Sequence, residues 1–196
     1  MYILTRSGRQ FSFTNPQPDM VAVEDVAHAL SNINRFTGHT AYAYSVAQHC
    51  VSVSRYLELT GHPVIVQYAG LLHDAHEAYF GDISSPLKAF LGVAPLEDRI
   101  QAVVAEAFGL TTAQMHDRSV KLADLTALAV EVDHLMPRDS IEWDCLAPVT
   151  PDMKAMMPPP SERSASLSAW VFLDRFNLLQ EQLRSFAPST NRSATQ

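Results

Sequence analysis

Hydrophobic residues recur with a helical period along most of the chain after residue 20. In the stretch "YSVAQHCVSVSRYL", one stripe of a helix would carry Val46, His49, Cys50, Val53 and Leu57. We therefore expect His49 to point toward the core of the protein. The same period continues over residues 64–80, 96–108, 119–136 and 166–183. The pattern predicts an all-α fold, a helical bundle of about six or seven helices.

Three segments depart from this helical pattern. The stretch "YILTRSGRQFSF" has two short β-prone runs on either side of a Ser-Gly pair, which predicts a small hairpin over residues 2–13. Residues 137–163 contain six prolines and are expected to form a long surface loop. The polar residues 188–196 are expected to be a disordered tail, so the single domain would span residues 1–187.

Two helix starts can be predicted from capping residues. Ser85 is a candidate N-cap for a short helix with Pro86, a residue preferred in the first turn. Thr111 and Gln114 have the spacing of a capping box, which predicts the start of the helix that continues over residues 119–136.

Composition narrows the class of protein further. A chain of 196 residues, 47% of them hydrophobic, is long enough to bury a core as one globular domain. The 14 Lys and Arg residues against 21 Asp and Glu give a net charge of -7, which argues against nucleic-acid binding and requires local positive charge for an anionic substrate. Two distant cysteines, Cys50 and Cys145, and the absence of a signal peptide or membrane-length apolar run predict a cytoplasmic protein with no membrane association.

Polar residues at inward-facing helix positions need an explanation. His49, the adjacent pair His73 and Asp74, and Asp124 each fall on a predicted core face, where an unpaired polar group would cost several kcal/mol, roughly. Two imidazoles and two carboxylates would suit a divalent transition metal with open coordination positions. Glu77 lies three residues after Asp74, so it borders the same site and could act as a base toward water there.

A purely structural interpretation remains open for each of these residues taken singly. A lone helical histidine such as His49 is more often a hydrogen-bonded core residue than a ligand, and Asp124 could pair with a neighbouring arginine. A zincin motif is excluded, since His76 and Glu77 begin the pattern HExxH but Phe80 takes the place of the second histidine. The roles of His39 and His76 stay open.

The order of these residues resembles a known family. "SVAQHC", then "LLHDAHEAYFGDISSPLK", then "VKLADL" is similar to the HD-domain metal-dependent phosphohydrolases, whose signature is H…HD…D. The resemblance is strongest to the branch of bacterial 5′-deoxynucleotidases and compact phage-type deoxynucleoside triphosphatases, including deoxyadenosine triphosphatases. It covers roughly residues 20–136, and the motif residues that match in order are His73, Asp74, Glu77, Gly81, Asp82, Pro86 and Lys88.

The resemblance implies a role for each matching position. The metal ligands would be His49, His73, Asp74 and Asp124. Glu77 would be the catalytic carboxylate, and Asp82 the second acidic residue that orients the attacking water or assists the leaving group. The implied reaction is hydrolysis of a phosphate ester of a deoxynucleotide, giving the nucleoside and either phosphate or triphosphate.

Three cationic residues are candidates for binding the phosphate groups of a substrate. Lys88 follows Pro86 in a first helical turn, where free N–H groups favour an anion, and Lys121 lies one turn before Asp124. Arg35 and Phe36 stand where the family branch carries an arginine followed by an aromatic residue, so Phe36 could stack on a base or belong to the core. Lys88 and Lys121 could also be ordinary solvated lysines.

Two other functions stay open beside the nucleotide phosphohydrolase. One is a non-catalytic metal-binding HD module with a regulatory role, and the presence of Glu77 and Asp82 argues against it. The other is a cyclic-nucleotide phosphodiesterase, which usually has more histidines. The substrate's base, sugar and phosphate number, the metal (Mn, Co, Zn, Ni or Fe) and the oligomeric state are also open, although the family often forms dimers or larger rings. Only 24 residues separate His49 from His73, so base selectivity does not transfer from the family.

Overall fold

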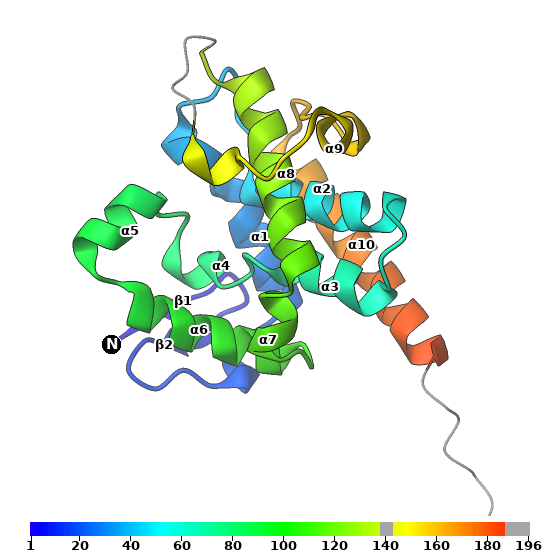
Figure 1. Ribbon diagram of the computed structural model, residues 1–196. Coiled ribbons are helices and arrows are strands. Elements are labelled where there is room, and N and C mark those ends of the chain that lie inside the picture. Colours follow the sequence, from blue (N-terminus) through cyan, green and yellow to red (C-terminus); the bar gives the residue numbers. More distant parts are fainter. Residues whose placement is uncertain (138–142, 187–196) are drawn as a thin grey trace, which may run out of the picture.

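Helices make up most of the computed structural model, which describes residues 1–137 and 143–186 (Figure 1). In chain order the α-helices are α1 (Val23–Asn32), α2 (Val46–Leu59), α3 (Val64–Leu72), α4 (Glu77–Phe80), α5 (Ser85–Leu91), α6 (Ala94–Ala107), α7 (Thr112–Met115), α8 (Arg118–Leu135), α9 (Pro151–Met156) and α10 (Ala165–Phe186). Short 3-10 helices occur at η1 (Pro18–Met20), η2 (Arg35–Gly38) and η3 (Asp144–Leu146). The predicted all-α class is confirmed.

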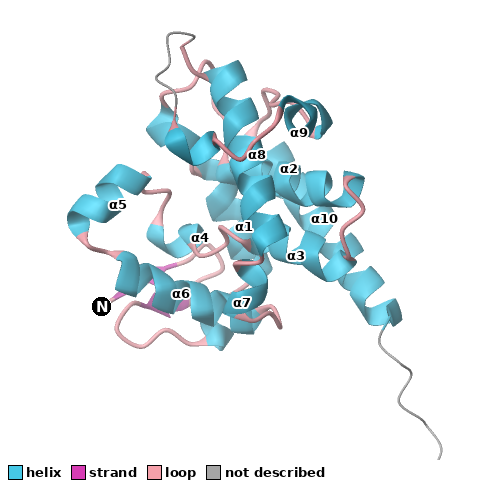
Figure 2. Cartoon of the chain, in the orientation of Figure 1, coloured by secondary structure: helices cyan, strands magenta, loops and turns pink. Residues whose placement is uncertain are grey.

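The N-terminal hairpin is confirmed as well. Strands β1 (Tyr2–Leu4) and β2 (Gln10–Ser12) pair antiparallel, and they stand out against the helices in Figure 2. The turn between them is tied to α1, because the Asp25 carboxylate accepts hydrogen bonds from the backbone N–H of Ser7 at 2.8 Å and from its hydroxyl at 2.6 Å. The hairpin is therefore anchored to the helical body by a buried carboxylate.

Helix α2 occupies the centre of the bundle and packs against α1, α3, α8 and α10. Its buried face carries the predicted stripe, with Val46, His49, Cys50, Val53 and Leu57 all fully buried. At Gly70 the approach of α3 to α2 is so close that an added Cβ atom would lie 2.4 Å from a side-chain carbon of Leu57. This close packing brings the buried faces of α2 and α3 together.

A buried arginine ties the last helix to the two central ones. Arg175 of α10 is completely buried and donates to Ser54 Oγ at 3.0 Å, to Gln67 Oε1 at 2.8 Å and to Glu58 Oε1 at 3.1 Å. Because these partners lie on α2 and α3, one guanidinium crosslinks three helices. Buried charges need this degree of hydrogen bonding to be tolerated.

Some predicted boundaries were wrong. The capping box of Thr111 and Gln114 forms, but it starts only the short helix α7, and α8 begins separately with Asp117 as its N-cap. Helix α5 starts one residue earlier than expected, with Ser84 at the N-cap position and no side-chain cap. Ser85 is therefore inside the helix.

The Pro-rich segment also differs from its prediction. Within residues 137–163 the structure contains η3 and α9, where an uninterrupted loop was expected. Thr150 caps α9 by accepting a hydrogen bond from the N–H of Met153, and Pro151 occupies its first position. Pro151 therefore stands in the first turn of a helix, a position that proline favours. Residues 138–142 of this segment and the predicted tail at 188–196 lie outside the described residues.

In the part of the chain that the structure describes, no helix is long and apolar enough to cross a membrane.

Candidate metal centre

His49 is positioned by the start of α2. Ser45 and Gln48 form a capping box there, with the side chain of each bonded to the backbone N–H of the other. His49 follows within the first turn and is fully buried. Local sequence therefore sets where α2 begins, and the close packing around α2 directs the imidazole inward.

His73 and Asp74 lie at a break in the predicted helix over residues 64–80. In a continuous helix the carbonyl of His73 would accept from the N–H of Glu77. That carbonyl instead accepts a hydrogen bond from Gln101 Nε2 of α6 at 3.2 Å, while the Glu77 N–H donates to Asp74 O at 3.0 Å. The prediction of one helix over residues 64–80 was wrong, since the chain here forms tighter turns with bonds three residues back, between α3 and α4.

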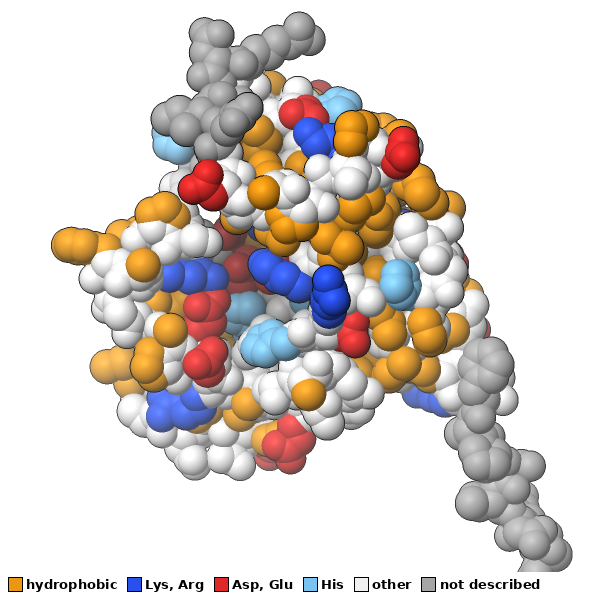
Figure 3. Space-filling model, in the orientation of Figure 1, with side chains coloured by type: hydrophobic (Ala, Val, Ile, Leu, Met, Phe, Trp, Pro, Cys, Tyr) orange, Lys and Arg blue, Asp and Glu red, His pale blue; other side chains and the backbone are white. Residues whose placement is uncertain are grey.

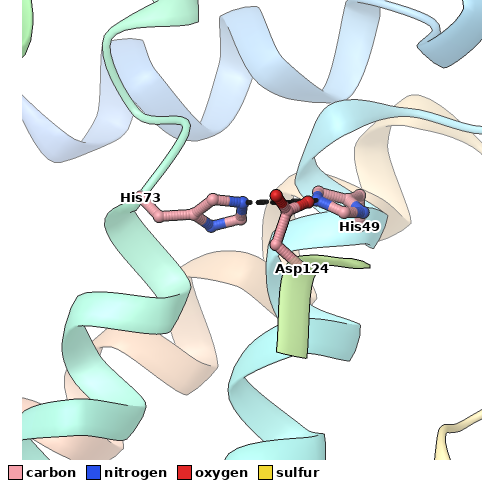
Figure 4. A group of neighbouring side chains, drawn as sticks. All are labelled: His49, His73 and Asp124. Carbon is pink, nitrogen blue, oxygen red and sulfur yellow. Dashed lines mark hydrogen bonds and ion pairs between the residues drawn. The ribbon is translucent and has the colours of Figure 1, made fainter. Parts of the chain in front are cut away.

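The predicted metal ligands converge from three segments of the chain. His49 comes from α2, His73 and Asp74 follow α3, and Asp124 comes from α8. Figure 4 shows both imidazoles directed at the Asp124 carboxylate. The Nε2 atom of His49 lies 3.3 Å from Nε2 of His73, 3.2 Å from Asp124 Oδ1 and 3.6 Å from Asp74 Oδ2. The Nε2 atom of His73 lies 3.2 Å from Asp74 Oδ2 and 3.8 Å from Asp124 Oδ1.

These separations suit a single transition-metal ion. Ligand bonds of about 2.0–2.2 Å place neighbouring ligand atoms about 2.8–3.6 Å apart in tetrahedral or octahedral geometry. Four of the five distances fall in this range, and the fifth, between His73 and Asp124, exceeds it by only 0.2 Å. His49, His73 and Asp124 together form a group that could hold a metal ion.

The outer nitrogens of both imidazoles are already used. His49 Nδ1 donates to Glu131 Oε1 at 2.6 Å, and His73 Nδ1 donates to the carbonyl of Gly70 at 2.8 Å. Each bond leaves a lone pair on the Nε2 atom, as in metal-binding histidines. Two lone pairs and two carboxylates facing each other would repel without a cation, so this donor set fits a metal ion.

The charged groups of the cluster change one another's pKa. Burial alone would lower the pKa of His73, but the carboxylates of Asp74 and Asp124 outweigh it and raise that pKa well above its usual value. Burial alone would raise the pKa of Asp124, but hydrogen bonds from the two imidazoles, which can each carry a proton on Nε2 when no metal is bound there, hold it well below its usual value. Protons therefore compete with a metal ion for the imidazole nitrogens.

Cys50 is a neighbour that sequence analysis did not connect with the site. With His73 and Asp74 it forms a second group that could hold a metal ion. Burial, reinforced by the charges of Asp74 and Glu77, raises the pKa of its thiol well above the usual value. Because a thiol binds metal as the thiolate, the two-histidine, two-aspartate set is the better ligand set.

A pocket of about 540 Å³ opens beside the cluster. Figure 3 shows basic and acidic side chains gathered in a hollow on this face of the molecule. All but two of the predicted site residues line it: the pocket residues are Arg35, Phe36, Thr37, Asp74, Glu77, Asp82, Ile83, Ser84, Ser85, Pro86, Lys88, Lys121, Asp124, Leu128, Trp143 and Cys145. The two exceptions, His49 and His73, are buried beneath it.

Glu77 and Asp82 face the same pocket in different surroundings. Glu77 is buried, and its Oε2 atom has no hydrogen-bond partner among the described residues. Burial, with the nearby charge of Asp74, raises the pKa of Glu77 well above its usual value. Burial also raises the pKa of the less enclosed Asp82. Both carboxyl groups are therefore biased toward holding a proton, which is typical of functional carboxyl groups.

Lys88 is held by two carboxylates. Its Nζ atom makes a close ion pair with Glu97 Oε1 and lies 3.8 Å from Glu77 Oε1. The same Glu97 oxygen lies 3.0 Å from Nε2 of His76. The backbone N–H of Lys88 donates to Ser84 O at 2.9 Å, so this N–H is not itself free to bind an anion. His76 is thus linked to the site through Glu97 and Lys88.

The other predicted substrate residues have partners of their own. Arg35 donates to Glu131 Oε2 through Nε at 3.2 Å and Nη2 at 3.0 Å, and its Nη1 lies 4.0 Å from Asp74 Oδ2. Lys121, with a largely exposed side chain, pairs with Asp124 Oδ2 at 2.8 Å. His39 is exposed and is not among the residues that line the pocket.

Glu131 is the important residue that sequence analysis passed over. It lies on α8, seven residues after Asp124. Its buried carboxylate bonds to both His49 and Arg35, and the charge of Arg35 and His49 lowers its pKa against the opposing effect of burial. The signal available in the sequence was an acidic residue two turns after Asp124 on the buried face of an apolar helix.

The geometry defines the class of protein as a mostly helical protein with a buried His/Asp cluster able to hold a metal ion. No family model matches the chain. Over 183 residues it is 36% identical to the uncharacterized protein YfdR of Escherichia coli K12, which spans 92% of this chain and 96% of YfdR. It is 35% identical over 147 residues to the uncharacterized protein RCAP_rcc00048 of Rhodobacter capsulatus, covering 70% of this chain and 74% of that protein. The chain belongs to the family of these two proteins.

Proposed function

We propose that this protein is a metal-dependent phosphohydrolase of the HD-domain class that acts on nucleotides. The reaction would remove phosphate or triphosphate from a deoxynucleotide and leave the nucleoside. The observation that carries the proposal is the cluster of His49, His73 and Asp124, with the Asp74 carboxylate next to both imidazoles, beside a pocket that also holds Glu77 and Asp82.

His49, His73, Asp74 and Asp124 would hold the metal, with manganese, cobalt, zinc, nickel and iron as the candidates. A divalent ion bound here supplies Lewis-acid polarisation of a phosphoryl oxygen and makes water more acidic. Glu131 keeps the His49 ring in place through the bond to Nδ1. The carboxylates balance the charge of the ion in a buried site.

Glu77 is suited to accept and hold a proton. Its carboxyl group faces the pocket, its Oε2 atom has no partner among the described residues, and its pKa is raised by burial. A general base works best when its pKa is near the working pH. Asp82, in the same pocket, would orient the attacking water or assist the leaving group.

Positive charge lines the pocket close to these carboxyl groups. Arg35, Lys88 and Lys121 all reach it, although the net charge of the chain is negative. Charge-assisted hydrogen bonds from such groups bind phosphate oxygens strongly. A phosphate ester would replace the carboxylate partners that Lys88 and Lys121 have in its absence.

The acidic pair favours an enzyme over a non-catalytic metal-binding module. A module that only holds a metal ion has no use for Glu77 and Asp82 outside the ligand set. A single set of two histidines likewise gives less support to a two-metal cyclic-nucleotide phosphodiesterase.

A substrate panel tests the proposal. The purified protein is stripped of metal, reloaded with each candidate ion, and incubated with deoxynucleoside mono-, di- and triphosphates and with cyclic nucleotides. Release of phosphate or of triphosphate is then measured separately. We expect metal-dependent release from at least one deoxynucleotide. Absence of release with every ion, from a protein that binds the ions, would contradict the enzyme and favour the non-catalytic module.

A further inference from the structure

The pocket beside the metal cluster is lined by two chemical classes of side chain. Its ionisable residues include Asp74, Asp124 and Glu77. Its neutral residues include two aromatic side chains, Phe36 and Trp143, which lie against each other. A ligand that fits such a pocket has both a charged group and an uncharged, flat or apolar group.

Trp143 is the largest of the neutral side chains that line the pocket. It precedes η3, which packs against α8, and 37% of its surface is exposed. Its ring centroid lies 6.4 Å from that of Phe36, with the two rings tilted by 46°. Rings tilted this far leave no parallel slot between them, so they form an angled wall with a face available to a third ring.

The backbone at Phe36 is held in an unfavourable conformation that supports this wall. Phe36 has a φ of 54° and Thr37 a φ of 53°, in the left-handed region that residues other than glycine rarely adopt. Strained backbone of this kind persists where its surroundings demand it, often at ligand sites. The strained segment directly follows Arg35, which is bonded to Glu131, and it carries the Phe36 ring that lies against Trp143.

We propose that Trp143, supported by Phe36, is the surface on which the base of a nucleotide stacks. The inference rests on the proposed function, and it assigns the segment around η3, outside the HD-like motif, to substrate binding. Asp124 and Leu128 both line the pocket from α8, four residues or about 6 Å apart along the helix axis. Leu128 thus lies about one helical turn beyond the candidate ligand Asp124, a spacing that fits a sugar between phosphate and base.

Tryptophan fluorescence tests the proposal directly. The chain has two tryptophans, and Trp170 lies on α10 and is not a pocket residue. In a Trp170→Phe, Glu77→Gln protein, which limits turnover, Trp143 is the sole reporter. Saturating deoxyadenosine 5′-monophosphate with Mn²⁺ is expected to quench its emission, and deoxyribose 5-phosphate, which has no base, is expected to leave it unchanged. Quenching by both compounds or by neither would overturn the proposal.

Calorimetry on variants supplies an independent measurement. Trp143→Ala is expected to weaken binding of deoxyadenosine 5′-monophosphate by about 5- to 150-fold, the range for loss of one base–aromatic stack, and Trp143→Phe by much less. Binding of deoxyribose 5-phosphate should be the same in all three proteins. Equal nucleotide affinity in wild type and Trp143→Ala would overturn the proposal.

The same experiments separate this inference from the proposed function. Phosphate release that is insensitive to Trp143→Ala would leave the hydrolase intact and remove the stacking surface. Trp143-dependent nucleotide binding without hydrolysis by the wild-type protein, under any of the metals, would keep the stacking surface and remove the hydrolase.

Discussion

The Glu131 carboxylate lies 2.6 Å from the Nδ1 atom of His49, and both side chains are buried. A carboxylate at this distance keeps the proton on Nδ1, which directs the Nε2 lone pair at the cluster of His73, Asp74 and Asp124. The second Glu131 oxygen is bonded to Arg35. One carboxylate thus connects a ligand of the candidate metal centre with a cation of the candidate substrate pocket.

Glu131→Gln should therefore weaken metal binding without removing a ligand. Because the amide cannot provide the negative charge that stabilises the His49 tautomer, we expect metal affinity to fall by about 10- to 100-fold. Calorimetric titration of the metal-free protein with Zn²⁺ measures the change. Asp133→Asn is the matched control, since Asp133 is exposed on the same helix and pairs with Lys154. Equal affinities in the two variants would contradict the role given to Glu131.

Asp124→Ala should abolish metal binding. The change removes one ligand and one of two charges that offset the ion in a buried site, so elemental analysis should find metal only at background level. Metal should no longer raise the thermal stability, whereas the wild type should gain about 2.7 kcal/mol at a free metal concentration of 100 times Kd. Asp98→Ala, at an exposed position of α6, serves as control. Full metal content in folded Asp124→Ala would exclude Asp124 from the site.

Glu77→Gln separates proton transfer from metal binding. The amide keeps the shape of the side chain but accepts no proton, so kcat should fall by about 100-fold or more while metal content and substrate affinity are retained. Steady-state kinetics with elemental analysis on the same sample measure both. Near-normal kcat together with lower stability would instead assign Glu77 a structural role.

Lys88→Ala should weaken the binding of nucleotides, and more strongly for those that carry more phosphate groups. Loss of a charge-assisted contact is expected to cost about 1–3 kcal/mol, with triphosphates affected more than monophosphates if Lys88 contacts the outer phosphates. Calorimetry with the two nucleotides measures the difference, and Lys154→Ala, outside the pocket, is the control. Equal losses would place Lys88 at the α-phosphate. Unchanged affinity for both nucleotides would show that Lys88 only pairs with Glu97.

Asp25 should make the stability of the hairpin contact depend on pH. Burial opposes ionisation, but the hydrogen bonds from Ser7 outweigh it and lower the pKa of Asp25. A lowered folded-state pKa contributes stability above the unfolded pKa of about 3.9, and this contribution is lost as pH falls through the folded value. Asp25→Asn should therefore cost about 1–2 kcal/mol at pH 7 and less below about pH 4.

Urea unfolding of wild type and variant at pH 7 and below pH 4 measures this difference. The exposed neighbour Glu24 provides the control, since Glu24→Gln should change stability little at either pH. If the free energies of unfolding of Asp25→Asn and wild type differ by the same amount at both pH values, the negative charge of Asp25 does not stabilise the hairpin contact.

Local sequence determined much of the fold. Helical periodicity is a property of consecutive residues, so the long helices and the burial of His49 followed from it, and the N-terminal hairpin followed from its turn residues. The candidate ligands could be selected in the same way. His73, Asp74 and Asp124 stood out as polar residues on apolar helix faces, and the structure places their side chains together with that of His49.

Contacts between distant residues decided the rest. When a residue is bonded to a partner far away in the chain, its neighbours in the sequence carry no pattern that identifies this partner. At the helix break, the His73 carbonyl is bonded by Gln101 from 28 positions away, and Glu131 bonds Arg35 from a distance of 96 positions. Trp143 lines the pocket next to η3, which packs against α8. Periodicity can select residues that need a partner, but the partner itself depends on how the helices pack, and that is a property of the whole chain.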